Sequence, residues 1–289
     1  MKERKNFLSL LAELNKVRIT IAVTLTTLAG YTLAHKQIDT GVILPLIGIF
    51  ILACGSAALN QYQERDRDIL MKRTQNRPIP SGKISPRSAA IIAFSEIIIG
   101  TIIIYVGSNP EAALLGFLAF VWYNLIYTPL KRKTAFAVIP GSVIGSLPPV
   151  VGWVAGGGAL TDPKLLVLAF FFFISQVPHF WLLMLKYGQE YVDAGYPSIT
   201  TALNQKQIKR VTFVWTVATA LVVLLMIYSG LITPLFFEIL VLIASVWLIA
   251  VFSKLFRKIS VTLNPFYYFM RLNYFVLTVI ISLIIGPLI

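Results

Sequence analysis

The chain has 289 residues, of which 57% are hydrophobic and only 13% are charged. This composition excludes an ordinary soluble globular domain and predicts a polytopic membrane protein. A formal net charge of +13 would suggest a nucleic-acid partner in a soluble protein, but here the basic residues follow membrane topology, so no nucleic acid is expected.

Nine apolar runs divide the chain, and most of them are long enough for a spanning helix. They lie near residues 19–34, 41–62, 88–107, 112–128, 136–155, 164–185, 210–230, 233–252 and 267–289. The fifth run contains three glycines and three prolines, a composition tolerated where neighbouring protein satisfies the loosened backbone, as in the lining of a cavity. We therefore predict an all-α protein with nine transmembrane helices, forming one integral-membrane domain over residues 1–289.

The basic residues predict how these helices are oriented. With the N-terminus placed in the cytoplasm, nearly all of the 25 lysines and arginines fall in cytoplasmic segments. The exceptions are Lys36 and Lys164 outside, and Arg271 near the inner start of the last helix. This bias predicts a cytoplasmic N-terminus and an external C-terminus, with the two longest inner connections at residues 63–87 and 186–210.

A charged cluster ends the second run, where a membrane would normally forbid it. Asn60, Glu64 and Asp68 are spaced four residues apart, so on a helix they share one face. Oxygen ligands at this spacing suit Mg²⁺, which is held through one or two carboxylates together with substrate phosphates. The nearby cations Arg65, Arg67, Lys72, Arg73 and Arg77 would meet the remaining phosphate charge. The alternative is a solvated, salt-bridged helix end.

A second acidic segment lies on the same predicted membrane face. Glu190 and Asp193 are three residues apart and would point the same way on a helix. If the two inner connections face each other, Glu190 would join the first cluster and clamp a diphosphate through metal ions, which neutralises a leaving pyrophosphate. An ordinary cytoplasmic loop is the alternative.

Two further positions carry polar groups at or within the spans. Tyr127 and Lys131 are four residues apart at the inner end of the fourth run, so Lys131 can face a phosphate while Tyr127 lies one turn deeper. His179 follows Pro178 deep in the sixth run, where it could contact a substrate, ligate iron or act as a base. The plainer interpretations are an interfacial aromatic beside basic residues and a hydrogen-bonded interior histidine.

Several pieces of sequence together resemble the intramembrane, UbiA-type prenyltransferases over most of the chain. They are Asn60-x-x-x-Glu64-x-x-x-Asp68, Met71-Lys-Arg-Thr-x-Asn-Arg77-Pro, Gly145-x-x-Pro148-Pro149-x-x-Gly152-Trp153 and Gln176-x-Pro178-His179-Phe180-Trp181, followed by Glu190-Tyr191. The third and fourth pieces resemble the branch of the family that makes heme O. Among the departures are Glu64 and Glu190, where the family usually has aspartate and which both keep the carboxylate. Another is Lys16-Val17-Arg18, which stands where the family has Lys-Pro-Arg.

The resemblance implies a helical bundle around a central cavity, with Mg²⁺ held by Asn60, Glu64 and Asp68 and with Glu190 opposite. These four are the expected catalytic residues, and the expected substrate-binding residues are Arg73, Arg77, Tyr127, Lys131, His179 and Tyr191. The implied reaction is loss of pyrophosphate from farnesyl diphosphate, attack of the allylic cation on a vinyl group of heme b, and addition of water. The implied setting is the cell inner membrane and its lipid, with a downstream heme-modifying enzyme or a terminal oxidase as partner.

Two alternatives stay open at this point. A member of the same family would act on a quinone-precursor ring or another lipid-soluble acceptor. A membrane transporter would also have nine spans and broken helices. The position of the charges separates these classes, because a transporter is expected to place ionisable groups near the midplane, whereas here the acids concentrate at one face.

Overall fold

The computed structural model describes residues 6–256 and 264–289, and within these ranges the chain folds into helices and no strand. Nine helices of this described part are long and apolar enough to cross a membrane. The all-α, nine-span prediction is therefore confirmed, and the chain is a multi-pass membrane protein.

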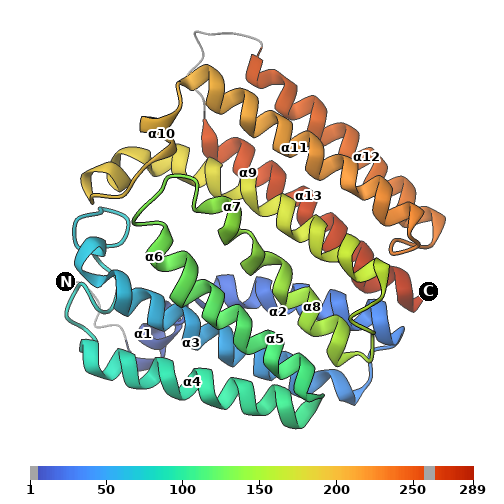
Figure 1. The fold of residues 1–289 in the computed structure, drawn as a ribbon, viewed down its shortest axis with the longest axis horizontal. Helices are drawn as coiled ribbons and strands as arrows, with labels where there is room; N and C mark the ends of the chain where they lie inside the picture. The colour runs from blue at the N-terminus through green and yellow to red at the C-terminus, as the bar shows by residue number, and fades with distance from the viewer. Residues whose placement is uncertain (1–5, 257–263) are drawn as a thin grey trace.

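The spans and the short helices follow one another as shown in Figure 1. The spans are α2 (Val17–His35), α3 (Ile43–Asp68), α4 (Pro86–Gly107), α5 (Pro110–Val121) with a π-helical turn (Trp122–Tyr127) and α6 (Thr128–Leu130), α7 (Val138–Gly141) with α8 (Val143–Ala155), α9 (Pro163–Asp193), α11 (Gln205–Tyr228), α12 (Leu235–Ser253) and α13 (Pro265–Ile285). The short helices are α1 (Phe7–Leu14) and α10 (Ile199–Ala202), with 3₁₀ turns at Thr40–Val42, Lys254–Phe256 and Gly286–Leu288.

Local sequence sets where several helices begin. The Asn109 side chain accepts a hydrogen bond from the backbone amide of Ala112 at 2.8 Å, and Pro110 occupies the first turn of α5. Asn204 and Gln207 form a reciprocal capping box at the start of α11. Such caps satisfy the amides that have no partner within the helix, so these starts are encoded locally.

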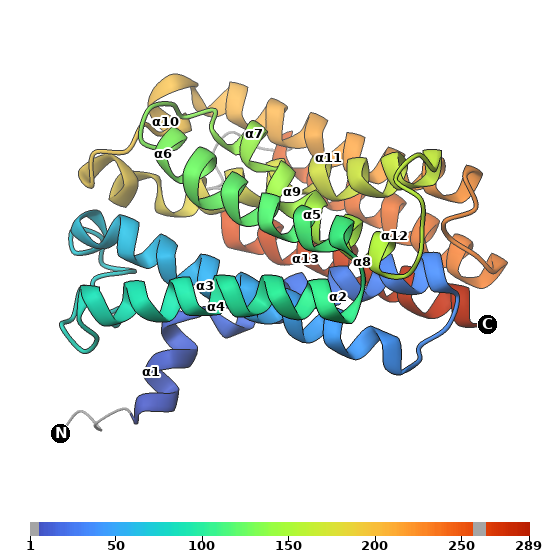
Figure 2. The same cartoon turned by 60° about the horizontal axis from the view of Figure 1, so that its bottom comes forward.

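The helices lie roughly side by side, and α3 packs along α4, α2 along α8, and α9 along α11. The loop after α3, the helix α6, the C-terminal end of α9 and α10 all gather at one end of the bundle, on the left of Figure 1. The C-terminus lies at the opposite end. Figure 2 shows α1 projecting from the bundle, away from the spans. The two acid-bearing segments therefore share one end, as the alternating topology predicts.

The close contact between α2 and α8 depends on glycine. A Cβ atom added at Gly152 would overlap the backbone carbonyl oxygen of Thr27, and one added at Gly30 would overlap that of Pro149. Small residues allow two membrane helices to approach until their backbones touch, which replaces the hydrophobic driving force that lipid does not provide. The broken fifth span is thus held against α2 by its glycines.

We expect Gly152→Ala to destabilise the protein by about 2 kcal/mol or more, because the added methyl group meets rigid backbone. The matched control is Gly116→Ala, where a Cβ would lie 3.0 Å from Ile104 Cδ1 and 3.1 Å from Leu52 Cδ2, both at the ends of flexible side chains. Thermal unfolding in detergent measures the difference. Equal unfolding temperatures for the two variants would contradict this account of the α2–α8 contact.

Three helices extend further than their apolar runs predict. α3 continues beyond residue 62 through the charged residues to Asp68. α9 continues beyond residue 185 to Asp193, with a break at Tyr187 (φ −115°, ψ 15°), and α11 begins at Gln205 rather than near residue 210. The predicted inner connections at 63–87 and 186–210 are therefore too long at their ends. Charged residues with partners in the fold continue α3 and α9, and the capping box at Asn204 starts α11 earlier.

Candidate active site

One face of α3 carries three buried polar side chains at the charged end of the bundle. Asn60, Glu64 and Asp68 expose 2%, 4% and 0% of their surfaces, whereas Asp66 on another face is exposed. The helix continues through all of them, so the predicted four-residue spacing does place them together on one side.

Each of these three side chains has a cation beside it. Lys16 Nζ donates a hydrogen bond to Asn60 Oδ1 at 2.8 Å, and Arg77 Nη1 lies 2.7 Å from Asp68 Oδ2. Lys131 forms an ion pair with Glu64 in which both side chains are largely buried. Buried charges persist only when paired, so this arrangement explains how carboxylates are tolerated inside the bundle.

The π-helical turn in the fourth span and Thr128 after it are hydrogen-bonded to α3. Its extra residue per turn lets Thr128 Oγ1 donate to the carbonyl of Tyr123 at 2.9 Å, and Thr128 in turn accepts from Asn60 Nδ2 at 3.1 Å. Gln63 Nε2 donates to the carbonyl of Asn124 at 3.0 Å. Single π turns are often found at functional sites, and this one fixes the helix end that carries Lys131.

The segment after the α9 break meets the loop after α3. Glu190 Oε2 accepts a hydrogen bond from the backbone amide of Arg73 at 3.1 Å, and the Arg73 guanidinium donates to the hydroxyl of Tyr191 at 3.3 Å. Tyr196 reaches deeper, where its hydroxyl donates to Glu64 Oε1 at 3.2 Å. The predicted meeting of the two inner segments is therefore present in the structure.

Glu190 is more exposed than the other three predicted metal ligands. It is partly exposed at the rim and holds the backbone of the facing loop, whereas Glu64 and Asp68 are buried. In the described parts of the chain, no group of three or more His, Cys, Asp or Glu side chains gathers closely enough to hold a metal ion. The structure thus brings together two carboxylates and one amide, and a metal-binding role for Glu190 stays a prediction.

The donor set on α3 fits a hard divalent cation bound together with an anion. It offers carboxylate and amide oxygens, and Asp68 Oδ1 is buried with no hydrogen-bond partner among the described residues. One or two carboxylates plus phosphate oxygens are the usual ligands of Mg²⁺ in proteins. A buried acceptor oxygen without a partner costs free energy, which a bound cation would recover.

Burial and neighbouring charges shift the pKa values of three groups in this cluster. Burial lowers the pKa of Lys131, but the carboxylate of Glu64 outweighs it and holds that pKa above its usual range. Burial, together with Arg77 and Lys131, lowers the pKa of Lys16 to about 7. Burial beside Glu64 raises the pKa of Tyr196 to about 12, so its hydroxyl remains a donor. Lys131 therefore keeps its positive charge, whereas burial and the neighbouring cations destabilise the charged form of Lys16.

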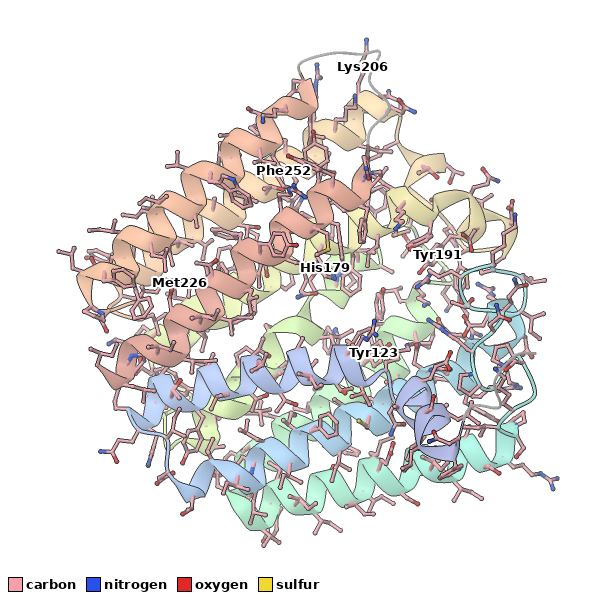
Figure 3. All side chains as sticks on the ribbon, turned by 180° about the vertical axis from the view of Figure 1, so that it is seen from behind. Tyr123, His179, Tyr191, Lys206, Met226 and Phe252 are labelled. Atoms are coloured by element: carbon pink, nitrogen blue, oxygen red, sulfur yellow. The ribbon has the colours of Figure 1, made fainter. Side chains whose placement is uncertain are left out.

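A row of aromatic rings leads from the charged cluster to His179. Tyr123 stacks on Tyr127 with centroids 6.1 Å apart and planes 19° apart, and Tyr127 lies 6.1 Å from Phe180. His179 packs 4.6 Å from Phe269 and is 2.9 Å from Asn273 Oδ1 through Nδ1. Figure 3 shows His179 towards the middle of the molecule and Tyr191 near its charged end. The row thus joins the two predicted substrate regions.

Sequence reasoning missed three residues of this site. Lys16 was noted as a basic residue before the first span and as part of Lys16-Val17-Arg18, but it was not predicted to bind substrate or metal, and Thr128 and Tyr196 were not singled out as site residues. Their partners are 44, 68 and 132 residues away along the chain. The one available signal was the position of Lys16 at the start of an apolar run, and a positive-inside residue gives the same signal.

The sequence matches the UbiA prenyltransferase family over residues 23–279. A protoheme IX farnesyltransferase of Geobacter sulfurreducens is 39% identical over 75% of this chain and 80% of that protein. One of Aquifex aeolicus is 34% identical over 88% of each chain. Among solved structures, a digeranylgeranylglyceryl phosphate synthase superposes with a TM-score of 0.76 at 16% identity, covering 97% of this chain and 98% of that one. A UbiA homologue from Archaeoglobus fulgidus bound to GPP and Mg²⁺ superposes with a TM-score of 0.74 at 14% identity, covering 96% and 99%. These structures share the fold described above.

Proposed function

Because this chain belongs to the UbiA prenyltransferase family, we propose that it transfers a farnesyl group from farnesyl diphosphate to a vinyl group of heme b, making heme O. Relatives named protoheme IX farnesyltransferase support this donor and acceptor. The observation that carries the proposal is the buried cluster of Asn60, Glu64 and Asp68, in which each oxygen-bearing side chain has a cation beside it.

The cluster suits a diphosphate and a metal together. We assign Asn60, Glu64 and Asp68 as metal ligands, with Glu190 as a further one from the rim. A divalent cation, Mg²⁺ in this proposal, supplies Lewis acidity that neutralises the leaving diphosphate. A solved family member bound to GPP and Mg²⁺ supports this choice of metal. The other phosphate oxygens would meet three cations. Lys131 acts as a point charge, and Arg77 and Arg73 act as forked donors.

The reaction follows from where charge develops. The C–O bond of farnesyl diphosphate breaks, and its electron pair leaves with the diphosphate, which the cations of the cluster stabilise. The allylic cation lies beside the faces of Tyr123, Tyr127 and Phe180, which attract positive charge and exclude water. The vinyl double bond of heme supplies the electron pair for the new C–C bond. Water then adds to the resulting cation and loses a proton, leaving a hydroxyethylfarnesyl group.

His179 and Tyr191 complete the proposed substrate contacts. The Asn273 oxygen next to His179 Nδ1 favours a proton on that nitrogen, which leaves Nε2 with a lone pair. We place His179 on the heme side and Tyr191, which is bonded to Arg73, on the diphosphate side.

We also propose a single domain over residues 1–289 in the cell inner membrane, with the N-terminus cytoplasmic and the C-terminus outside. The charged end of the bundle would then face the cytoplasm, where farnesyl diphosphate is in solution. The transporter interpretation is not retained, because the family is one of prenyltransferases. A downstream heme-modifying enzyme or terminal oxidase stays a predicted partner.

Product analysis tests the function. Purified protein given heme b, farnesyl diphosphate and Mg²⁺ is expected to yield a product heavier than heme b by a farnesyl chain plus water, and a metal chelator is expected to abolish it. Mass spectrometry of the extracted porphyrins makes the measurement, and a parallel reaction offers a quinone-precursor ring. Prenylation of that ring without any change to heme would overturn the proposed acceptor and keep the prenyltransferase chemistry.

A further inference from the structure

Lys16 stands in a turn that the fold holds in a specific shape. It lies between α1 and α2 with a positive φ of 49°, a left-handed conformation that is unfavourable for a residue with a side chain. A non-glycine residue persists there only when its surroundings compensate the cost. The neighbours of Lys16 provide that compensation.

Side chains from two spans bind the chain just before Lys16. Gln61 Nε2 donates to the carbonyl oxygens of Glu13 and Leu14 at 2.9 Å and 2.8 Å. Asn15 Nδ2 donates to Glu96 Oε1 on α4 at 2.6 Å. Gln61 immediately follows Asn60 on α3, so the same turn of that helix fixes the loop and receives the Lys16 ammonium.

The direction of the Lys16 side chain is chemically informative. A lysine before a membrane span would normally extend to the lipid headgroups and to water. Here it turns inward, and its Nζ donates to Asn60 Oδ1 at 2.8 Å. This amide oxygen belongs to the group assigned to the metal, so a metal ion and the Lys16 ammonium would need the same acceptor.

The net charge of the cluster also disfavours binding of a metal ion alone. Within the described part of the chain, Lys16, Arg77 and Lys131 lie near two carboxylates, those of Glu64 and Asp68. A bare divalent cation would therefore enter a site that already has excess positive charge, whereas a diphosphate would find its charge matched. Once an anion is present, the cations can turn to its oxygens and leave the α3 oxygens to the metal.

From this geometry we propose that Lys16 is a further diphosphate-facing cation, and that in the substrate-free protein it occupies the Asn60 oxygen, so that the metal and the diphosphate bind together rather than one after the other. This inference rests on the proposed function. It adds a residue from the first turn of the fold to the site, and it assigns that residue a part in coupling the two ligands. By thermodynamic linkage, each ligand then raises the affinity for the other by the same factor.

The test measures protein-bound Mn²⁺ by equilibrium dialysis of the full chain in detergent, with and without an unreactive farnesyl thiodiphosphate. The unmodified protein is expected to bind Mn²⁺ weakly alone and at least about tenfold more tightly with the analogue. A factor of this size is what the removal of one nearby positive charge from the metal site can produce. Lys16→Met is expected to bind Mn²⁺ alone about tenfold more tightly than the unmodified protein and to lose most of the coupling.

Lys133→Met is the matched control, because it removes the same charge from an exposed side chain near Lys131 and is expected to keep both affinities. Lys16→Arg keeps the charge and is expected to retain the coupling. If Lys16→Met does not fold, Lys16→Gln supplies the same comparison with a neutral donor to Asn60.

The outcomes separate the two proposals. If the unmodified protein binds no Mn²⁺ even with the thiodiphosphate, the proposed function fails. If it couples the two ligands and the neutral Lys16 variants couple them equally well, only the role of Lys16 is overturned.

Discussion

Asp68→Asn is expected to reduce metal-dependent diphosphate release by about a thousandfold or more, because a metal in such a site contributes several kcal/mol and each 1.4 kcal/mol is a factor of ten. Asp68 is fully buried, its Oδ2 holds Arg77, and its Oδ1 has no partner in the described structure. Asparagine keeps the shape and removes the negative charge. The measurement is diphosphate released from farnesyl diphosphate at saturating Mg²⁺.

The control for this variant is Asp66→Asn, two residues away on the same helix. Asp66 is exposed and pairs with Arg65 at 3.6 Å on the surface, so its replacement is expected to leave activity within about twofold. Asp68→Asn also leaves Arg77 short of a partner, which is expected to cost about 3 kcal/mol of stability, so thermal unfolding must accompany the assay. A folded Asp68→Asn protein with full activity would remove Asp68 from the proposed metal site.

Lys131→Met is expected to lower kcat/KM for farnesyl diphosphate by about 10²–10³, since it removes a fixed charge aimed at the developing diphosphate. Lys131 is largely buried and paired with Glu64, and the carboxylate keeps it protonated across the physiological range. The loss should fall on the donor, so the KM for the acceptor should change less. Steady-state kinetics with each substrate varied in turn makes the distinction.

The same substitution is expected to lower stability, because it leaves the Glu64 carboxylate buried without its cation, a change that costs about 3–5 kcal/mol in other proteins. Tyr196 remains a donor to Glu64 and limits the loss. Lys131→Arg keeps the charge and should recover part of the activity. Unchanged kinetics in a stably folded Lys131→Met protein would contradict the role given to this residue.

The helical span count and the α3 face were predictable because both are local. An apolar run of sufficient length must form a helix in lipid, where every backbone polar group needs a partner within the segment. Given a helix, positions 60, 64 and 68 share a side whatever the rest of the chain does. The helix ends were less predictable: α3 continues to Asp68, beyond its apolar run, because the charged residues there have partners elsewhere in the fold.

The sequence by itself therefore determined the all-helical membrane fold, the three oxygen-bearing side chains on one helix face, and a basic segment at the same end. Only the tertiary structure decided which cation meets which oxygen, that Glu190 holds the Arg73 backbone at the rim, and that Lys16 turns inward to Asn60. The physical reason is distance along the chain. Periodicity fixes neighbours within a few turns of one helix, whereas contacts between residues 44 to 132 positions apart depend on how the helices pack.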